Sequence, residues 1–153
     1  MSCSVVGRES DIRADVAPKP ATTREPAVVS VILNTNRRED TLACLTSLSQ
    51  STYQNQRAIV LDNASTDGSV DAIRARFPDV LIIPLAENRG YAGNNNIGIG
   101  AALARGADWV FVLNEDTIVD RECLAELVRI GESDDRIGIV GPMVYHFDEP
   151  TVI

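Results

Sequence analysis

The chain has 153 residues, of which 44% are apolar, enough to form the core of one globular domain. It carries 22 acidic residues against 14 Lys and Arg, a formal net charge of -8 at pH 7. This charge repels nucleic acid and anionic lipid surfaces, so no nucleic-acid partner is expected. An anionic ligand would have to be held locally by a cation, an arginine or backbone amides.

No apolar run approaches the ~20 residues that span a bilayer, and the start of the chain lacks the apolar middle of a signal peptide. The sequence therefore predicts a cytoplasmic protein without a transmembrane segment. The three cysteines are far apart and fit neither a zinc site nor a disulfide framework. Cys44 and Cys123 fall within helical patterns, where buried packing is expected.

Residues 1–26 show no sustained periodicity, and three prolines fall within 17–26, so we interpret this region as a flexible tail. The folded domain is expected at 27–153. Its pattern alternates between β-rich runs and amphipathic stretches. Strands are predicted at 28–33, 58–62, 80–84, 109–113 and 137–144.

The helices predicted between these strands have apolar residues at helical spacing. The first three are marked by Leu42, Leu45 and Leu48, by Val70, Ile73 and Phe77, and by the small residues of 98–104. The fourth has Leu124, Leu127 and Val128 on its inner face, and Asp120 is predicted to be its N-cap.

Continuous apolar strands that alternate with amphipathic helices predict an α/β fold with a mainly parallel sheet covered on both faces. Such sheets bind ligands beyond the carboxyl ends of their strands. Four strands are followed by polar segments, which read NTNRRED, NASTDGS, ENRGYAGNNN and NEDT. Turn formation alone explains any one of them. Four segments on one edge favour a binding site.

The strand at 109–113 runs directly into Asn114, Glu115 and Asp116. If strand alternation continues, Asn114 and Asp116 point to one side and Glu115 to the other. A carboxylate at this position can bind Mg²⁺ or Mn²⁺, which prefer oxygen ligands and share their shell with substrate phosphates. The alternative is that Asp116 only starts the turn that follows.

The segment ENRGYAGNNNIGIG, at 87–100, complements the acidic one. Gly90 and Gly93 allow a ligand to approach the backbone closely. The helix that follows can direct free amides towards phosphate oxygens.

These segments, in this order, resemble the inverting glycosyltransferases of family 2, which have the GT-A fold, a Rossmann-like α/β/α sandwich. The resemblance covers about 28–150 and is strongest to the bacterial branch of rhamnosyl and related cell-surface polysaccharide transferases. It implies nucleotide contacts at Asn34, Thr35, Asn36 and Asp62, and a second group at Asn88, Gly90, Asn96 and Gly98. The family's Asp-x-Asp motif corresponds to Asn114, Glu115 and Asp116.

The sequence also departs from the family pattern. An aromatic residue is common at the position of Thr35, so stacking on the base is expected to be weaker. Asn114 replaces the first acidic residue, which leaves Asp116 as the expected metal ligand and Asn114 as a ribose or phosphate contact. The family continues past the position of Ile153 into an acceptor-binding half with the catalytic carboxylate. The fold is therefore expected to be incomplete at the C-terminus, and no catalytic residue is assigned; Asp148 and Glu149 are interpreted as surface carboxylates.

The resemblance implies transfer of a sugar, with inversion, from a nucleoside diphosphate sugar to the hydroxyl of a saccharide or lipid-linked acceptor. A UDP- or dTDP-sugar is the expected donor, and Mg²⁺ or Mn²⁺ the expected cofactor. The alternative is a catalytically inactive nucleotide-binding or pseudoenzyme domain of the same fold, so activity of these 153 residues alone stays open. Apolar surface left uncovered near 137–147 predicts self-association.

Overall fold

The computed structural model describes residues 24–147, and its centre is one parallel sheet of four strands. The strands are β1 (Val28–Asn34), β2 (Gln56–Asp62), β3 (Leu81–Pro84) and β4 (Trp109–Asn114), in the order β3-β2-β1-β4. β1 is central, and its neighbours begin level with it, because Val28 pairs with both Gln56 and Trp109. The predicted α/β architecture with a parallel sheet is confirmed.

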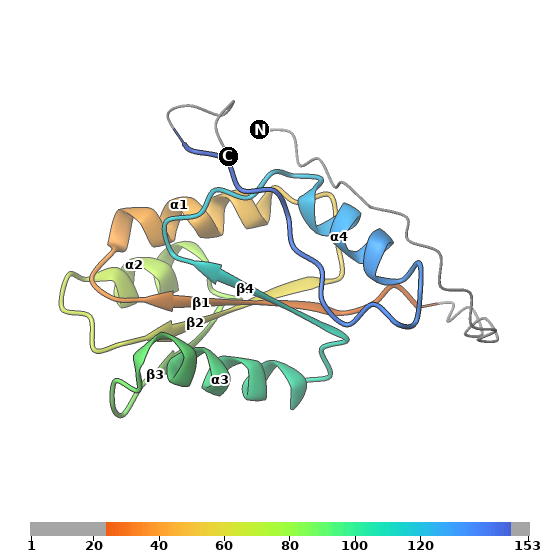
Figure 1. Cartoon of the computed structure of the whole chain (residues 1–153). Helices are drawn as coiled ribbons and strands as arrows, with labels where there is room; N and C mark the ends of the chain where they lie inside the picture. The colour runs from red at the N-terminus through yellow and green to blue at the C-terminus, as the bar shows by residue number, and fades with distance from the viewer. Residues whose placement is uncertain (1–23, 148–153) are drawn as a thin grey trace.

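Helices cover both faces of this sheet (Figure 1). α1 (Arg38–Ser49), α2 (Ser69–Arg76) and α4 (Cys123–Gly131) lie on one face, and α3 (Gly90–Leu103) lies on the other. Every residue of β1 is buried, as expected for a strand covered on both sides. Within the described part of the chain, no helix is long and apolar enough to cross a membrane.

Two apolar clusters form the core, one on each face of the sheet. Side chains alternate along β1, so Val28 and Ile32 pack with α1 and α4, whereas Val29 and Val31 face α3. The predicted apolar residues of α1 and α4 are buried, namely Leu42, Leu45, Leu48, Leu124, Leu127 and Val128. Of those predicted for α2, Ile73 is buried, whereas Val70 and Phe77 are half-buried. Cys44 and Cys123 are buried in the core, as predicted.

Several predicted boundaries were wrong. β4 ends at Asn114, and Glu115 and Asp116 form a turn, so strand alternation does not reach Asp116. α3 begins at Gly90, eight residues before the predicted range at 98–104. Asp120 is not the N-cap of α4, which begins at Cys123; its carboxylate instead accepts the N–H of Glu122, at 2.9 Å.

The fifth strand predicted at 137–144 is absent, because this segment has no regular structure. Its two glycines weaken an extended conformation, and Pro142 has no N–H for a strand ladder. The segment passes the apolar start of β4 instead, where Val140 packs against the core. Ile139, Val144 and Phe147 are exposed, and self-association through them stays a prediction.

Two further predictions concern the ends of the chain. Residues 1–23 of the predicted tail, as well as Asp148 and Glu149, lie outside the described residues. The last residues of the predicted tail contact the domain. Arg24 forms an ion pair with Asp108, at 2.7 Å, and the carbonyl of Pro26 accepts the hydroxyl of Tyr53.

α3 lies close to the sheet at Gly98. A Cβ at this position would lie 2.4 Å from Cγ1 of Val31 and 3.0 Å from Cδ1 of Leu61. Both neighbours are fully buried and have no room to move. The absence of a side chain at Gly98 therefore sets how closely α3 approaches the strands.

We expect Gly98→Ala to lower the free energy of unfolding by about 1–3 kcal/mol, because it overpacks the contact between α3 and the sheet. Gly100→Ala is the matched control, since a Cβ there meets nothing within 4 Å. Gly100→Ala should raise the free energy of unfolding by up to about 1 kcal/mol, because alanine favours the helix more than glycine does. Urea unfolding of both variants measures the difference, and equal effects would contradict the close approach.

Candidate functional site at the carboxyl edge of the sheet

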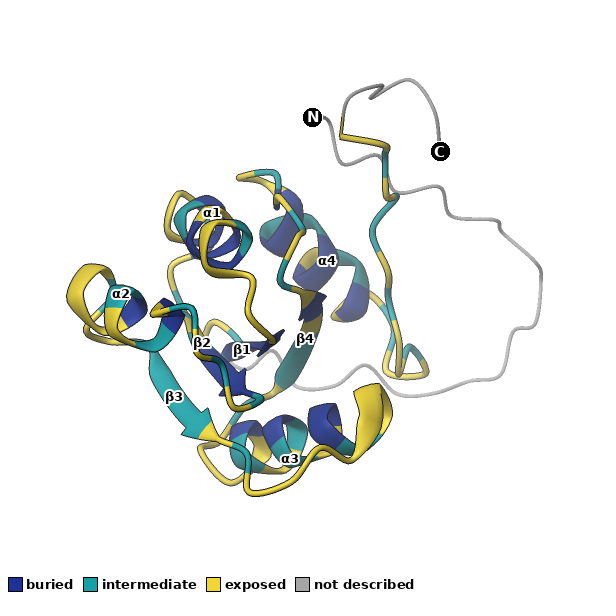
Figure 2. Cartoon of the chain, turned by 90° about the vertical axis from the view of Figure 1, so that its left-hand side faces the viewer, coloured by how far each residue is buried: buried dark blue, intermediate teal, exposed yellow. Residues whose placement is uncertain are grey.

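The four strands run parallel, so the loops that follow them lie on one edge, which Figure 2 faces. Asn34 pairs with Asp62, and Leu33 pairs with Asn114. The ends of β2 and β4 therefore flank the end of β1. The predicted site residues form two groups here, one around β1 and β2 and one around α3 and β4.

The first group is organised by Asn34, which is 0% exposed at the end of β1. The two hydrogens of its Nδ2 are shared among three acceptors, namely Oδ1 of Asp62 at 3.0 Å, Oγ of Ser65 at 3.0 Å and Oγ of Ser69 at 2.8 Å. Its Oδ1 accepts the hydroxyl of Thr41 at 2.9 Å. One buried amide thus joins β1, β2 and the starts of α1 and α2.

Asp62 is also mostly buried, with 6% of its surface exposed. One carboxylate oxygen accepts the Asn34 amide, and the other accepts the backbone N–H of Ser65 at 3.2 Å. The carboxylate is therefore held in one orientation at the end of β2. The nucleotide contacts predicted for Asn34 and Asp62 stay predictions.

The loops after β1 and β2 brace each other at the surface. Asn36 has a left-handed backbone with φ 53°; its N–H donates to Oγ of Ser65 at 3.1 Å, and its Oδ1 accepts the N–H of Thr66 at 2.7 Å. Thr35 is exposed beside them, and its Oγ1 accepts Nδ2 of Asn63 at 3.4 Å. These contacts fix the two loops as one surface.

Asp67 joins the starts of two helices. Its carboxylate accepts the N–H of Arg38, the first residue of α1, at 2.9 Å and the N–H of Ser69, the first residue of α2, at 3.0 Å. A hydrogen bond from the Ser69 side chain is the largest cause that lowers the pKa of Asp67 below 3.8, and these backbone N–H groups add to it.

The second group surrounds the start of α3. Oδ1 of Asn88 accepts the N–H of Gly90 at 2.9 Å and Nδ2 of Asn94 at 3.1 Å. Oδ1 of Asn94 accepts the N–H of Arg89 at 3.0 Å, and Asn94 is only 1% exposed. Gly90 has a φ of 73°, which an L side chain rarely adopts. Asn96 is exposed on the first turns of α3.

Asn114 ends β4 and Asp116 lies in the turn that follows, on the same edge, and both are exposed. Oδ1 of Asn114 accepts the hydroxyl of Tyr91 at 2.8 Å. Cys44 lies buried nearby. Burial raises the pKa of its thiol to about 12, and the carboxylates of Asp116 and Glu115 add to this rise. The Cys44 thiol near the acidic turn is therefore uncharged at neutral pH.

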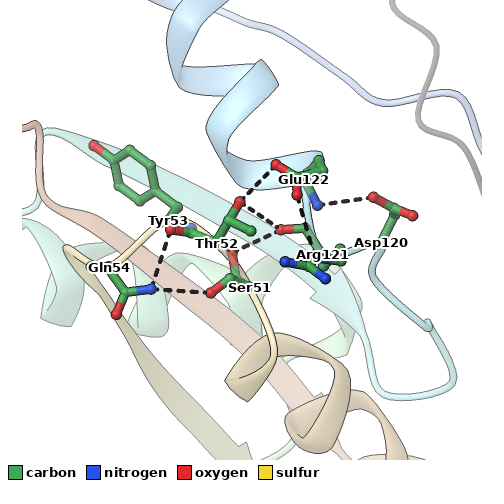
Figure 3. A network of polar contacts seen from close by, with 7 residues as sticks. All are labelled: Ser51, Thr52, Tyr53, Gln54, Asp120, Arg121 and Glu122. Atoms are coloured by element: carbon green, nitrogen blue, oxygen red, sulfur yellow. Dashed lines mark hydrogen bonds and ion pairs between the residues drawn. The ribbon is translucent and has the colours of Figure 1, made fainter.

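The far end of the β4 to α4 connection is tied to the loop after α1, as Figure 3 shows. The N–H of Thr52 donates to the carbonyl of Arg121 at 2.9 Å, and Oγ1 of Thr52 lies 2.9 Å from Oε2 of Glu122. The N–H of Val119 donates to Oγ of Ser47 at 3.0 Å. The connection that carries Glu115 and Asp116 is therefore held at its far end by α1 and the loop after it.

The donor chemistry of this turn fits a hard divalent cation. No group of three or more His, Cys, Asp or Glu side chains in 24–147 can hold a metal ion alone. Mg²⁺ and Mn²⁺ need fewer protein ligands, because one or two carboxylates combine with substrate phosphates and water. Asp116 supplies such a carboxylate, and no described residue donates a hydrogen bond to it or pairs with it.

An apolar hollow of about 140 Å³ lies elsewhere, between β4, α4 and the segment after α4. It is lined by Val28, Trp109, Phe111, Leu127 and Val140 among others. Val28 and Trp109 are the first residues of their strands, so the hollow is away from the carboxyl edge. It offers no charged or hydroxyl side chain to a nucleotide.

Sequence reasoning missed several residues that build this edge. Ser65 and Ser69 lie in NASTDGS and Asn94 lies in GNNN, so the motifs contained them without indicating their roles. Thr41 and Tyr91 carried no signal, because a hydroxyl on a helix is common and its partner is distant in sequence. Their partners Asn34 and Asn114 lie 7 and 23 residues away.

The parallel sheet between helices, with its polar carboxyl edge, places the chain in the class of α/β domains that bind ligands beyond the carboxyl ends of their strands. The family model of glycosyl transferase family 2 matches residues 30–153. The chain therefore belongs to glycosyl transferase family 2, as the sequence predicted.

Two curated relatives come from Mycobacterium tuberculosis. The chain is 32% identical over 108 residues to an N-acetylglucosaminyl-diphospho-decaprenol L-rhamnosyltransferase, covering 65% of this chain and 35% of that protein. It is 35% identical over 127 residues to the galactofuranosyltransferase GlfT1, covering 80% of this chain and 41% of that protein. The chain thus spans 35% and 41% of the length of these two relatives.

Solved structures agree with the predicted GT-A fold. The mannosyltransferase PcManGT from Pyrobaculum calidifontis, in complex with GDP-Man and Mn²⁺, matches with a TM-score of 0.65 and 27% identity, over 78% of this chain and 35% of that one. TarS 1-349 from S. aureus, in complex with UDP, matches with a TM-score of 0.62 and 16% identity, over 69% of this chain and 32% of that one. The predicted fold class is confirmed.

The hydrogen bonds of Asp67 should make the stability of the folded protein depend on pH. The pKa of Asp67 is lower in the folded protein, so its carboxylate stabilises the fold above the unfolded value of 3.8, and this contribution is lost as the pH falls through the folded pKa. At pH 7, Asp67→Asn should therefore be less stable than the wild type. The difference should shrink as the pH falls below 3.8.

Urea unfolding at a series of pH values measures this difference. Asp79→Asn is the control, because it removes the same charge from an exposed residue without a hydrogen bond in the described region. A stability loss in Asp67→Asn that stays constant down to the acid limit would contradict the role of the ionised carboxylate.

Proposed function

We propose that the carboxyl edge of the sheet binds a nucleoside diphosphate sugar together with Mg²⁺ or Mn²⁺. The chain would then supply the donor half of an enzyme that transfers the sugar, with inversion, to an acceptor hydroxyl. One observation carries this proposal. The chain is a family 2 domain, and two groups of hydrogen-bonded polar residues lie at the ends of its adjacent strands. The carboxylate of Asp116 lies at the same edge.

The nucleoside would lie over the loops after β1 and β2. Thr35 and Asn36 are exposed there, and Asp62 is fixed at the end of β2. A carboxylate oxygen has two lone pairs, so Asp62 can accept an N–H of a base in addition to its protein contacts. Asn34 would act through Asp62 as a positioning residue, because its own amide is buried.

The diphosphate would lie between α3 and the end of β4. The first N–H groups of a helix have no partner within the helix, and they attract phosphate oxygens. Gly90 keeps the backbone free of a side chain where α3 begins, and Asn96 presents an exposed amide on the same helix. These neutral donors suit a chain with a net charge of -8, which would otherwise repel a diphosphate.

Asp116 would hold the cation, and Asn114 would contact a phosphate or ribose oxygen of the donor. When bound, the cation neutralises negative charge on the diphosphate as it leaves the sugar. PcManGT, at 27% identity, was solved with GDP-Man and Mn²⁺, which supports the pairing of a nucleotide sugar with a divalent cation here.

In the proposed reaction, an acceptor hydroxyl attacks the anomeric carbon, the bond to the diphosphate breaks and a base takes the hydroxyl proton. No described residue is assigned as that base. The acceptor class we propose is a saccharide or a lipid-linked saccharide. The decaprenol-linked acceptor in the name of the mycobacterial rhamnosyltransferase supports the second of these.

Calorimetric titration with UDP, dTDP and GDP, each with and without Mn²⁺, tests the proposal. We expect binding of at least one nucleotide that requires the metal, and Asp116→Ala should weaken it at least about tenfold, equivalent to about 1.4 kcal/mol. Glu115→Ala is the matched control, because it removes the same charge from the neighbouring residue and should have a smaller effect.

Metal-independent binding, or equal losses in the two variants, would contradict a cation site at Asp116. Binding of a nucleotide sugar without transfer to any added acceptor would favour the alternative of a nucleotide-binding module. Absence of binding to all three nucleotides by the folded chain would contradict the proposed donor site.

A further inference from the structure

Tyr91 forms a bridge between the two elements that would enclose the diphosphate. It is the second residue of α3, and its hydroxyl donates to Oδ1 of Asn114, the last residue of β4, at 2.8 Å. Other hydrogen bonds at the start of α3, made by Asn88 and Asn94, stay within that loop and helix. Within residues 24–147, no other hydrogen bond joins the first turn of α3 to the end of β4.

This contact sets the orientation of the Asn114 amide. The Tyr91 hydroxyl occupies the amide oxygen, so the NH₂ group on the other side of the amide is turned away from it. No described residue accepts a hydrogen bond from that NH₂ group, although the side chain lies at the polar edge. An amide held in this way presents a hydrogen-bond donor to a ligand, whereas a carboxylate at this position would present a metal ligand.

We propose that Tyr91 is a positioning residue of the donor site, which fixes Asn114 as a hydrogen-bond donor to a phosphate or ribose oxygen of the nucleotide. This inference rests on the proposed function. In this arrangement Asn114 and Asp116 have different roles. Asn114 contacts the nucleotide directly, whereas Asp116 binds the cation. The site thereby offers a neutral N–H donor where a second acidic side chain would add to the repulsion of the diphosphate.

The exposure of Tyr91 makes the bridge a weak contributor to folding. The side chain is 56% exposed, and water replaces an exposed hydrogen bond at little cost. Tyr91→Phe removes only the hydroxyl and keeps the ring, so the variant should fold normally. A change in ligand binding then reports on the orientation of Asn114 and not on loss of structure.

The test is titration of the full 153-residue chain with the nucleotide that binds best among UDP, dTDP and GDP, at several Mn²⁺ concentrations. Tyr91→Phe should weaken nucleotide binding about fivefold to tenfold, the usual effect of one hydrogen bond. The Mn²⁺ concentration for half-maximal binding should stay within about twofold of the wild type, because Asp116 is unchanged.

A double-mutant cycle shows whether Tyr91 acts through Asn114. Asn114→Ala should weaken binding to a similar extent as Tyr91→Phe, and the double variant should be no weaker than Asn114→Ala alone. Tyr53→Phe is the matched control. Its hydroxyl donates to the carbonyl of Pro26, at the opposite end of β1, so it should leave nucleotide affinity unchanged.

Three results would overturn the inference while the proposed function stands. These are wild-type affinity in Tyr91→Phe, additive losses in the double variant, or a shift of the Mn²⁺ requirement in Tyr91→Phe that would make Asn114 part of the metal site. A wild-type chain that binds no nucleotide would instead reject the proposed function and, with it, the role of Tyr91.

Discussion

The amide of Asn34 is the contact on which the polar edge depends. It lies at the end of the most buried strand and binds Asp62, Ser65, Ser69 and Thr41. A buried amide that loses its partners costs about 1–3 kcal/mol, so the fold is most stable when β2, the loop after it and both helix starts are all in place. The exposed residues of these loops therefore need no ligand to organise them. Ser65 also accepts the backbone N–H of Asn36, so the hydrogen bonds continue from the buried amide to the exposed loop.

The second half of the edge is organised differently. The start of α3 is fixed by the side chains of Asn88 and Asn94, and its distance from the sheet is set by Gly98. The acidic turn after β4 is held from its far end by Ser47 and Thr52. Within the described residues, the hydroxyl of Tyr91 makes the only hydrogen bond between these two units. A chain with a net charge of -8 thus offers, at one edge, amides for an anion and a carboxylate for its cation.

The sequence predicted the sheet, the helices and the position of the polar edge, because apolar runs and helical spacing are local signals. The β-rich run at 28–33 indicated a strand, and the spacing of Leu45 and Leu124 indicated helices with buried faces, whereas the strand order came only from the structure. The segment at 137–144 was misassigned, since its apolar residues outweighed Gly138, Gly141 and Pro142 in the pattern. The contacts of Asn34 and Tyr91 could not be predicted. They join residues up to 35 positions apart, and only the folded sheet brings these together.

The most direct test of a donor site at this edge is an NMR titration of the ¹⁵N-labelled chain with a nucleoside diphosphate and Mg²⁺. If this edge binds the donor, the amide shifts that change are those of 34–36, 62–66, 88–96 and 114–116, on both sides of the end of β1. Changes confined to residues that line the apolar hollow, such as Phe111, Leu127 and Val140, would contradict it. So would a spectrum of the folded protein that no nucleotide alters.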